Sequence, residues 1–126
     1  MNNDGRKIEI SVGASRRAKT WKKVSYTWAG LLKKLSSPTR TQETMAEYKA
    51  MAKAKRDDLK DVGGFVGGIL KNGTRKADMV EARSLITLDL DHLPKGADIW
   101  PDVEVALDWA ACMYSTHSHT EDNPRV

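Results

Sequence analysis

The spacing of apolar side chains predicts a short strand and a short helix in the first third of the chain. Residues 7–12 (KIEISV) alternate between apolar and polar side chains, as a half-buried strand does. Residues 28–35 place tryptophan and leucine at helical spacing, with Thr27 before them as an N-cap. Pro38 then disfavours helical geometry in the residue before it, so we expect this helix to end there.

A longer helix is expected from about Thr41 to Lys60, because this segment is rich in Ala, Met, Lys and Glu. Its apolar positions fall on one stripe, and four basic positions form a second stripe beside it. The apolar set is Met45, Tyr48, Ala52 and Leu59, and the basic set is Lys49, Lys53, Arg56 and Lys60. The basic stripe is either a solvated helix face or a row of side chains that follows a phosphate backbone.

The second half of the chain alternates strands with a helix. Residues 61–70 (DVGGFVGGIL) lack the Lys-Ser/Thr of a phosphate-binding loop, so their glycine pairs predict a strand with a bulge or a close backbone approach. Residues 83–91 have the clearest strand pattern, followed by a helix from residue 98 or 101 to about 111 and a strand over 112–116. These elements predict an α+β fold, a mixed sheet with helices packed on it.

Length and composition fit one soluble domain, spanning residues 1–126. The chain is 40% apolar and contains no run of about 18 apolar residues, so we expect no membrane-spanning segment. Its N-terminus, MNNDGRKIEI, lacks the apolar stretch of a secretory signal, and we expect a cytoplasmic location. Cys112 is the single cysteine, which excludes a disulfide framework within the chain.

Charge is divided unevenly along the chain. Residues 1–60 carry 15 Lys and Arg against 6 Asp and Glu, whereas residues 61–126 carry 6 against 11. The basic half favours a polyanionic partner, and the acidic half favours bound cations. The alternative is the uneven charge that small domains commonly have.

Two carboxylates follow the apolar run of the segment 84–92 (SLITLDLDH). In a strand, Asp89 and Asp91 lie on the face opposite Ile86, Leu88 and Leu90, about 7 Å apart along the backbone. Two carboxylates at that spacing can share a divalent cation such as Mg²⁺ or Mn²⁺, which relieves their mutual repulsion. The alternative is that both belong to the turn that follows.

A second polar cluster follows the last predicted strand. Ser115, His117 and His119 lie within seven residues of Tyr114, and Arg125 comes shortly after. Hydroxyl, imidazole and guanidinium groups donate hydrogen bonds to phosphate oxygens, so the cluster suits a nucleotide. Zinc would require a third strong ligand beside the His-x-His pair. A polar, poorly ordered tail is the remaining alternative.

The order of these two clusters resembles the archaeo-eukaryotic primase superfamily, and most closely the primase-polymerase domains of phage and prophage replication proteins. Asp89 and Asp91 match the family's first motif, a strand that ends in Asp-x-Asp. Residues 115–117 (Ser-Thr-His) match its second motif, Ser-x-His at the end of the next strand. Arg125 fits the Pro-Arg pair that tends to follow in the phage-type members.

The resemblance implies metal-dependent nucleotidyl transfer onto a single-stranded DNA template. Asp89 and Asp91 would be metal ligands, and His117 with Ser115 would contact the triphosphate of the incoming nucleotide, so Asp89, Asp91 and His117 form the expected catalytic set. His119 takes that contact if the register is shifted by two residues, and Arg125 adds a further phosphate contact. The expected cofactor is Mg²⁺ or Mn²⁺, and the expected substrates are nucleoside triphosphates.

Charge alone suggests where the template strand binds. We expect its phosphates to be held by the basic stripe of the long helix and by four basic residues nearer the N-terminus. The stripe is Lys49, Lys53, Arg56 and Lys60, and the additional residues are Arg16, Arg17, Lys22 and Lys23.

One departure from the family pattern changes the expectation. The family's third motif, another apolar-Asp element, should follow well after Ser-x-His, but Val126 is only nine residues past His117. We therefore expect the N-terminal part of a catalytic domain, with an exposed sheet edge through which copies associate. Two alternatives stay open: a non-catalytic nucleic-acid-binding module, and an Asp-x-Asp phosphatase-like hydrolase with Asp89 as covalent nucleophile.

Overall fold

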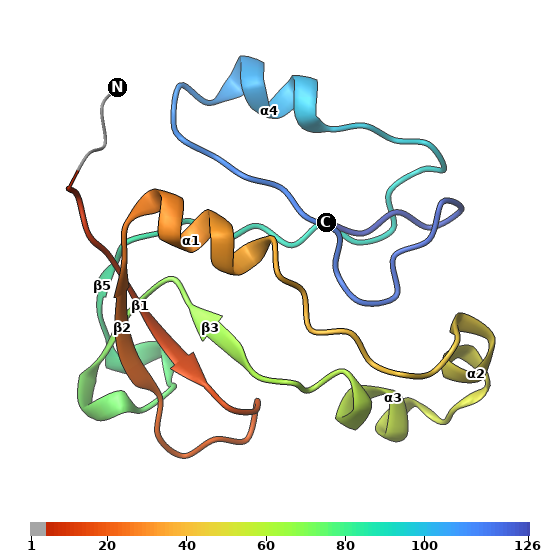
Figure 1. Cartoon of the computed structure of the whole chain (residues 1–126), viewed down its shortest axis with the longest axis horizontal. Coiled ribbons are helices and arrows are strands. Elements are labelled where there is room, and N and C mark those ends of the chain that lie inside the picture. The colour runs from red at the N-terminus through yellow and green to blue at the C-terminus, as the bar shows by residue number, and fades with distance from the viewer. Residues whose placement is uncertain (1–4) are drawn as a thin grey trace. The chain divides into compact units, whose positions relative to one another are not determined.

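A computed structural model describes residues 5–126, which form two compact units (Figure 1). The first unit extends to Thr87, and among its described residues it contains the five strands and three α-helices. The second unit, Leu88–Val126, contains one helix and long irregular segments. The combination of small sheets and helices confirms the predicted α+β class.

The first sheet is built around the strand that the alternating pattern predicted. β1 (Ile8–Gly13) lies between β2 (Lys22–Tyr26) and β3 (Gly64–Val66), and both pairings are antiparallel. Ile10 on β1 is 2% exposed and pairs with Val24 across the sheet. The strand predicted over residues 7–12 is therefore confirmed, and it supplies the centre of this unit's core.

A second, two-stranded sheet is tied to the first by one buried hydroxyl. β4 (Gly68–Leu70) pairs with β5 (Val80–Arg83) in antiparallel register, with an irregularity just before Leu70. Ser11 of β1 donates from Oγ to the carbonyl oxygen of Gly68 at 2.8 Å and accepts from the N–H of Leu70 at 3.3 Å. Because Ser11 is buried, these bonds satisfy backbone groups that water cannot reach.

The glycine pairs mark the close backbone approach that their sequence predicted. A Cβ placed on Gly68 would lie 2.2 Å from the carbonyl oxygen of Ala82, on the neighbouring strand. A Cβ on Gly67 would lie 2.9 Å from the Cβ of Leu85. Only glycine allows the chain to cross at these two points without displacing the backbone beside it.

α1 (Trp28–Leu35) confirms the first predicted helix with its predicted cap. The hydroxyl of Thr27 accepts a hydrogen bond from the N–H of Gly30 at 3.1 Å, which satisfies one of the amides that a helix start leaves unpaired. Leu31 points into the core and is 1% exposed. Ser36 caps the C-terminal end, two residues before Pro38.

The single helix expected from Thr41 to Lys60 is wrong. The structure has α2 (Met45–Ala50) and α3 (Lys53–Leu59), because residues 51 and 52 adopt extended backbone angles between them. α2 begins with a capping box in which Thr44 and Glu47 each bind the other's backbone N–H.

The break allows a contact between the two helices that one continuous helix would not allow. The guanidinium of Arg56 lies 5.7 Å from the centre of the Tyr48 ring, and Tyr48 is buried. In a continuous helix these residues would be separated by two turns, about 12 Å along the axis, and would not meet. Of the expected apolar stripe, Tyr48 is the buried member, Leu59 is half-buried, and Met45 and Ala52 are exposed.

The strand predicted over residues 83–91 is also wrong over most of its length. β5 ends at Arg83, and the carbonyl oxygen of Gly67 accepts from the N–H groups of both Ser84 and Leu85, at 2.9 and 3.1 Å. At this double contact the pairing of β4 with β5 ends, and the residues that follow do not pair with another strand in the described chain. Ile86 and Leu88, expected on a buried face, are 74% and 69% exposed.

In the second unit, the predicted helix is shorter and the predicted strand is absent. α4 (Trp100–Ala106) ends where Leu107 takes an extended conformation, before the expected end near residue 111. Residues 112–116 form no strand, because no ladder of hydrogen bonds accompanies them in the described chain. No helix within residues 5–126 combines the length and the apolar character needed to cross a membrane.

Candidate functional site

The two polar clusters singled out in the sequence are joined by an ion pair within the second unit. Arg125 donates from Nε to Oδ1 of Asp91 at 2.6 Å and from Nη2 to Oδ2 at 2.5 Å. This is the forked geometry in which a guanidinium binds both oxygens of a carboxylate. The side chains are 25% and 36% exposed, so solvent reaches both. The structure thus joins the end of the Asp-x-Asp segment to the segment after Ser-x-His.

Backbone hydrogen bonds hold the two segments beside each other. Leu90 and Val126 exchange both of their backbone hydrogen bonds, at 2.7 and 3.1 Å, as residues of two paired antiparallel strands do. The N–H of Thr116 donates to the carbonyl oxygen of Arg125 at 3.1 Å. Segments 90–91, 116 and 125–126 are therefore fixed by main-chain contacts that do not depend on the identity of the side chains.

The two histidines of the cluster have different surroundings. Nδ1 of His119 lies 3.1 Å from the backbone N–H of Arg125 and accepts from it when that nitrogen is unprotonated. The same nitrogen lies 3.3 Å from the carbonyl oxygen of Arg125, to which it donates when it is protonated. In the tautomer in which Nδ1 accepts, Nε2 has the proton and can donate to a ligand. Nδ1 of His117 lies 3.3 Å from the hydroxyl of Ser118, whose backbone is left-handed with a φ of 73°. Ser115 is exposed at the start of this turn.

Asp89 lies close enough to the second cluster to influence Tyr114 electrostatically. Partial burial raises the pKa of the Tyr114 phenol, and it is raised further by the negative charge that Cys112 takes on at high pH and by the charge of Asp89. Burial likewise raises the pKa of the Cys112 thiol, so the thiol stays protonated at neutral pH. Asp89 itself is exposed. The residues before Ser-x-His are thus within the electrostatic reach of the first carboxylate of Asp-x-Asp.

A second ion pair joins the loops that follow the two motifs, and sequence reasoning did not anticipate it. Nζ of Lys95 lies 2.6 Å from Oδ1 of Asp122, with both side chains well exposed. Exposed pairs of this kind contribute little to stability. The pair nevertheless provides a charge-matched comparison for Asp91 and Arg125 within the same unit.

The side chains near Asp91 offer few ligands for a metal ion held by the protein alone, and a metal ion bound jointly with nucleotide phosphates would need fewer of them. Within the described residues, no group of three His, Cys, Asp or Glu side chains is placed to hold a metal. Both oxygens of Asp91 already accept hydrogen bonds from Arg125. Mg²⁺, however, is commonly bound by only one or two carboxylates together with substrate phosphates and water. Asp89 and Asp91 supply that number of carboxylates, but the strand that would have placed both on one face ends at Arg83, and metal binding by them stays a prediction.

The expected basic stripe does not form a continuous row. Lys53 and Lys60 both bind Asp57, at 2.6 and 3.1 Å, and these contacts lower the pKa of Asp57 from 3.8 to about 2. Arg56 lies over Tyr48, and Lys49 is on the other helix. The single face expected of these four residues is therefore wrong, and contact of the individual residues with a template stays a prediction.

Several of the remaining basic residues are also paired within the first unit. Arg16 and Arg17 contact Asp58 at 2.9 and 3.1 Å, and Lys23 contacts Glu9 at 3.2 Å. Such exposed pairs are weak and can exchange for phosphate contacts at low salt. Phosphate binding by Arg16, Arg17, Lys22 and Lys23 likewise stays a prediction.

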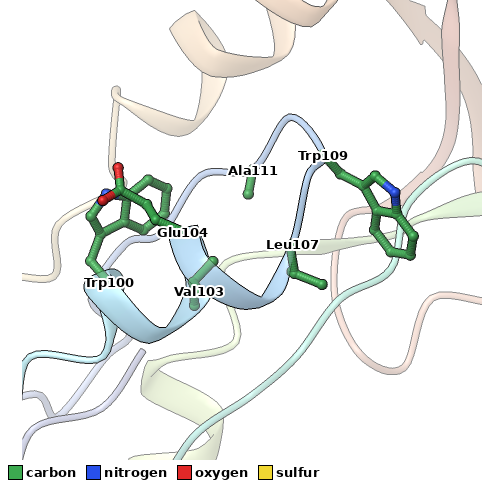
Figure 2. A pocket seen from close by; sticks show the side chains of 6 residues that line it. All are labelled: Trp100, Val103, Glu104, Leu107, Trp109 and Ala111. Carbon is green, nitrogen blue, oxygen red and sulfur yellow. The ribbon is translucent and has the colours of Figure 1, made fainter.

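A hollow beside α4 was not predicted from the sequence and contains none of the expected site residues. Its volume is about 360 Å³, and its lining consists of Trp100, Val103, Glu104, Leu107, Trp109 and Ala111. Figure 2 shows the two indole rings at opposite ends of the hollow, with Val103 on α4 and Leu107 just after its end lying between them. The two tryptophans that flank a helical apolar pattern were the signal available in the sequence, where the segment was predicted as a helix and neither tryptophan was singled out.

Comparison with known families identifies the chain. A family model described as the VapE N-terminal domain matches residues 1–126, and the chain belongs to this family. No curated protein and no solved structure matches the chain. Membership indicates a phage-associated protein of the replication type.

Proposed function

We propose that this VapE N-terminal domain is the nucleotide-binding part of a primase-polymerase, which transfers nucleotides from triphosphates onto a chain templated by single-stranded DNA. The contact between Asp91 and Arg125 carries the proposal, because it unites two motifs that resemble those of the primase-polymerase domains. Family membership supports the setting, phage-associated replication. The two carboxylates, two imidazoles and guanidinium supply the chemistry.

The proposal assigns metal binding to the carboxylates. Asp89 and Asp91 would hold Mg²⁺ or Mn²⁺, which when bound neutralises triphosphate charge and lowers the pKa of a 3′-hydroxyl group. The carboxylates bring the negative charge that makes a cation favourable at this point of the chain. Asp89 is the more accessible ligand, since Asp91 must first lose its contact with Arg125.

Phosphate binding falls to the second cluster. The guanidinium of Arg125 presents parallel donors that match a phosphate as well as a carboxylate. Nε2 of His119 would donate to a phosphate in the tautomer in which Nδ1 accepts from the Arg125 backbone. His117 and Ser115 add exposed donors on the same turn. Together these side chains can orient the triphosphate and compensate its charge, and the basic residues of the first unit would bind the template.

Isothermal titration with a nucleoside triphosphate tests the proposal. We expect binding that requires Mn²⁺ and that is lost in Asp89→Asn, which keeps the size of the side chain but removes its charge. Asp102→Asn on α4 is the matched control, since it removes one carboxylate elsewhere in the same unit. Loss of binding in both variants, or in neither, would contradict the assignment of Asp89.

A non-catalytic nucleic-acid-binding module is the second candidate function. It is supported by the paired state of Asp91 and by the lack of a three-donor metal group among the described residues. Such a module would bind single-stranded DNA without metal, with an affinity that falls steeply as salt rises. Metal-independent binding that survives Asp89→Asn would favour this candidate over nucleotidyl transfer.

A further inference from the structure

We infer that the Asp91–Arg125 pair favours binding of a metal–polyphosphate complex over binding of the metal ion or the polyphosphate alone. The complex can replace the partner of Asp91 and the partner of Arg125 at the same time. The inference rests on the proposed function, since the complex is the ligand that function requires. In the ligand-free protein, the carboxylate oxygens of Asp91 that would bind the metal ion accept hydrogen bonds from the guanidinium donors of Arg125 that would bind the phosphate. Asp91 would exchange its guanidinium for a metal ion, and Arg125 would exchange its carboxylate for a phosphate.

The charges of the pair mirror those of the ligand. Both oxygens of Asp91 accept from Arg125, so a metal ion alone meets a carboxylate whose charge is already compensated. A phosphate alone meets a guanidinium whose donors are already engaged. Either ion by itself would have to break the pair while replacing only one of the two partners, and so would give up the attraction within the pair, which is modest where solvent reaches both side chains. The complex brings both charges, and the exchange leaves neither member uncompensated.

The main chain can stay in place while the side chains exchange partners. The backbone of Arg125 is held by Thr116 and His119. The neighbouring Val126 is held by Leu90 through both its N–H and its carbonyl oxygen. None of these contacts uses the guanidinium. The exposed fractions of Arg125 and Asp91, 25% and 36%, leave a route for a ligand from solvent. Breaking the pair therefore requires side-chain rotation and not unfolding of the segment.

Titration with Mn²⁺ alone tests the metal side of the exchange. Arg125→Gln and Arg125→Lys both remove the fork that engages Asp91, and Arg125→Lys does so without changing the net charge. We expect Mn²⁺ affinity to rise about three- to fivefold in Arg125→Gln, and by a smaller factor in Arg125→Lys. Lys95→Gln is the matched control, since it removes one positive charge from the Lys95–Asp122 pair in the same unit and should change Mn²⁺ affinity by less than about twofold.

Titration with tripolyphosphate in EDTA tests the phosphate side. Asp91→Asn removes the carboxylate that engages Arg125, and we expect the affinity for metal-free tripolyphosphate to rise about three- to fivefold. Asp122→Asn makes the same change of charge at the other pair and should have less than half that effect. If the pair only stabilises the fold, the opposite result is expected: Arg125→Gln would bind Mn²⁺ more weakly than the unsubstituted protein, and Asp91→Asn would bind tripolyphosphate more weakly.

The outcomes separate this inference from the proposed function. Unchanged Mn²⁺ affinity in both Arg125 variants, alongside loss of Mn²⁺-dependent nucleotide binding in Asp89→Asn, would overturn the exchange and leave the function standing. Higher Mn²⁺ affinity in both Arg125 variants, with no nucleotide bound by any variant, would support the metal side of the exchange and overturn the function. Circular dichroism of each variant confirms that it is folded before it is titrated.

Discussion

Arg125 binds Asp91 through both carboxylate oxygens, although 34 positions separate the two residues along the chain. The pair lies where two motifs meet, and each member was expected to bind a different part of the same ligand. Asp91 was expected to bind a metal and Arg125 a phosphate. In the ligand-free protein the carboxylate and the guanidinium compensate each other's charge, so both groups can lie side by side before a ligand binds.

Gly68 should be intolerant of even the smallest side chain. In Gly68→Ala the new Cβ would lie 2.2 Å from a backbone oxygen of β5, so the strands must separate. Overpacking of this kind typically costs about 1–3 kcal/mol of unfolding free energy, which urea denaturation measures. Gly64→Ala is the control, because nothing lies within 4 Å of its Cβ position. Equal effects of the two substitutions would contradict the close approach of β4 and β5.

Ser11 should matter more than its small size suggests. Ser11→Ala removes the hydroxyl that satisfies Gly68 and Leu70, and leaving buried polar groups unsatisfied costs about 1–3 kcal/mol. Ser25→Ala on β2 is a matched control in an exposed strand position and should change unfolding free energy by less than about 0.5 kcal/mol. The link between the two sheets would be contradicted by a Ser11→Ala variant as stable as the control.

Local patterns predicted the elements for which a partner in the fold favours the same conformation as the pattern. The alternation of residues 7–12 predicted β1, and the Thr27 cap with the leucine spacing predicted α1. The glycine pairs also predicted the close approach around Gly68, since a glycine within an apolar run commonly marks the point where a second backbone comes near. In each case the sequence pattern and the tertiary packing favour the same structure.

Predictions failed where a distant contact decides the conformation. The segment 41–60 is helical in composition, yet Tyr48 and Arg56 meet only because the helix breaks between them. Residues 83–91 alternate as a strand does, but alternation does not supply a neighbouring strand, and β5 ends at Arg83. The sequence pattern indicates which secondary structure a segment is able to form, but a strand forms only where a neighbouring strand is available to pair with it.

The candidate site was predicted as a set of residues but not as a set of contacts. Residue type and order singled out Asp91, His119 and Arg125, which the structure brings together. Nothing in the spacing indicated that Arg125 would bind Asp91 itself, or that Lys95 would bind Asp122. Contacts between residues so far apart in the sequence depend on the path of the chain between them.

Asp57 should contribute to stability in a pH-dependent way. Hydrogen bonds from Lys53 and then Lys60 lower its pKa from 3.8 to about 2, so its ionised form is favoured by folding. This contribution is fully present above about pH 4 and is lost as the pH falls toward 2. In Lys53→Gln, NMR titration of the Asp57 carboxyl carbon should show a pKa closer to 3.8, whereas the exposed Lys55→Gln should leave it near 2. A pKa that is the same in both variants would contradict the pairing.

Paramagnetic broadening by Mn²⁺ tests the central claim most directly, because it locates the metal on the folded chain. With a non-hydrolysable nucleoside triphosphate present, we expect Mn²⁺ to broaden the amide resonances of residues 89–91, 115–119 and 125. The acidic residues on and around α4 are the natural competitors for a cation, and they are Asp98, Asp102, Glu104 and Asp108. Broadening centred on that segment, or no broadening at residues 89–91, would contradict a nucleotide site formed by Asp89, Asp91 and Arg125.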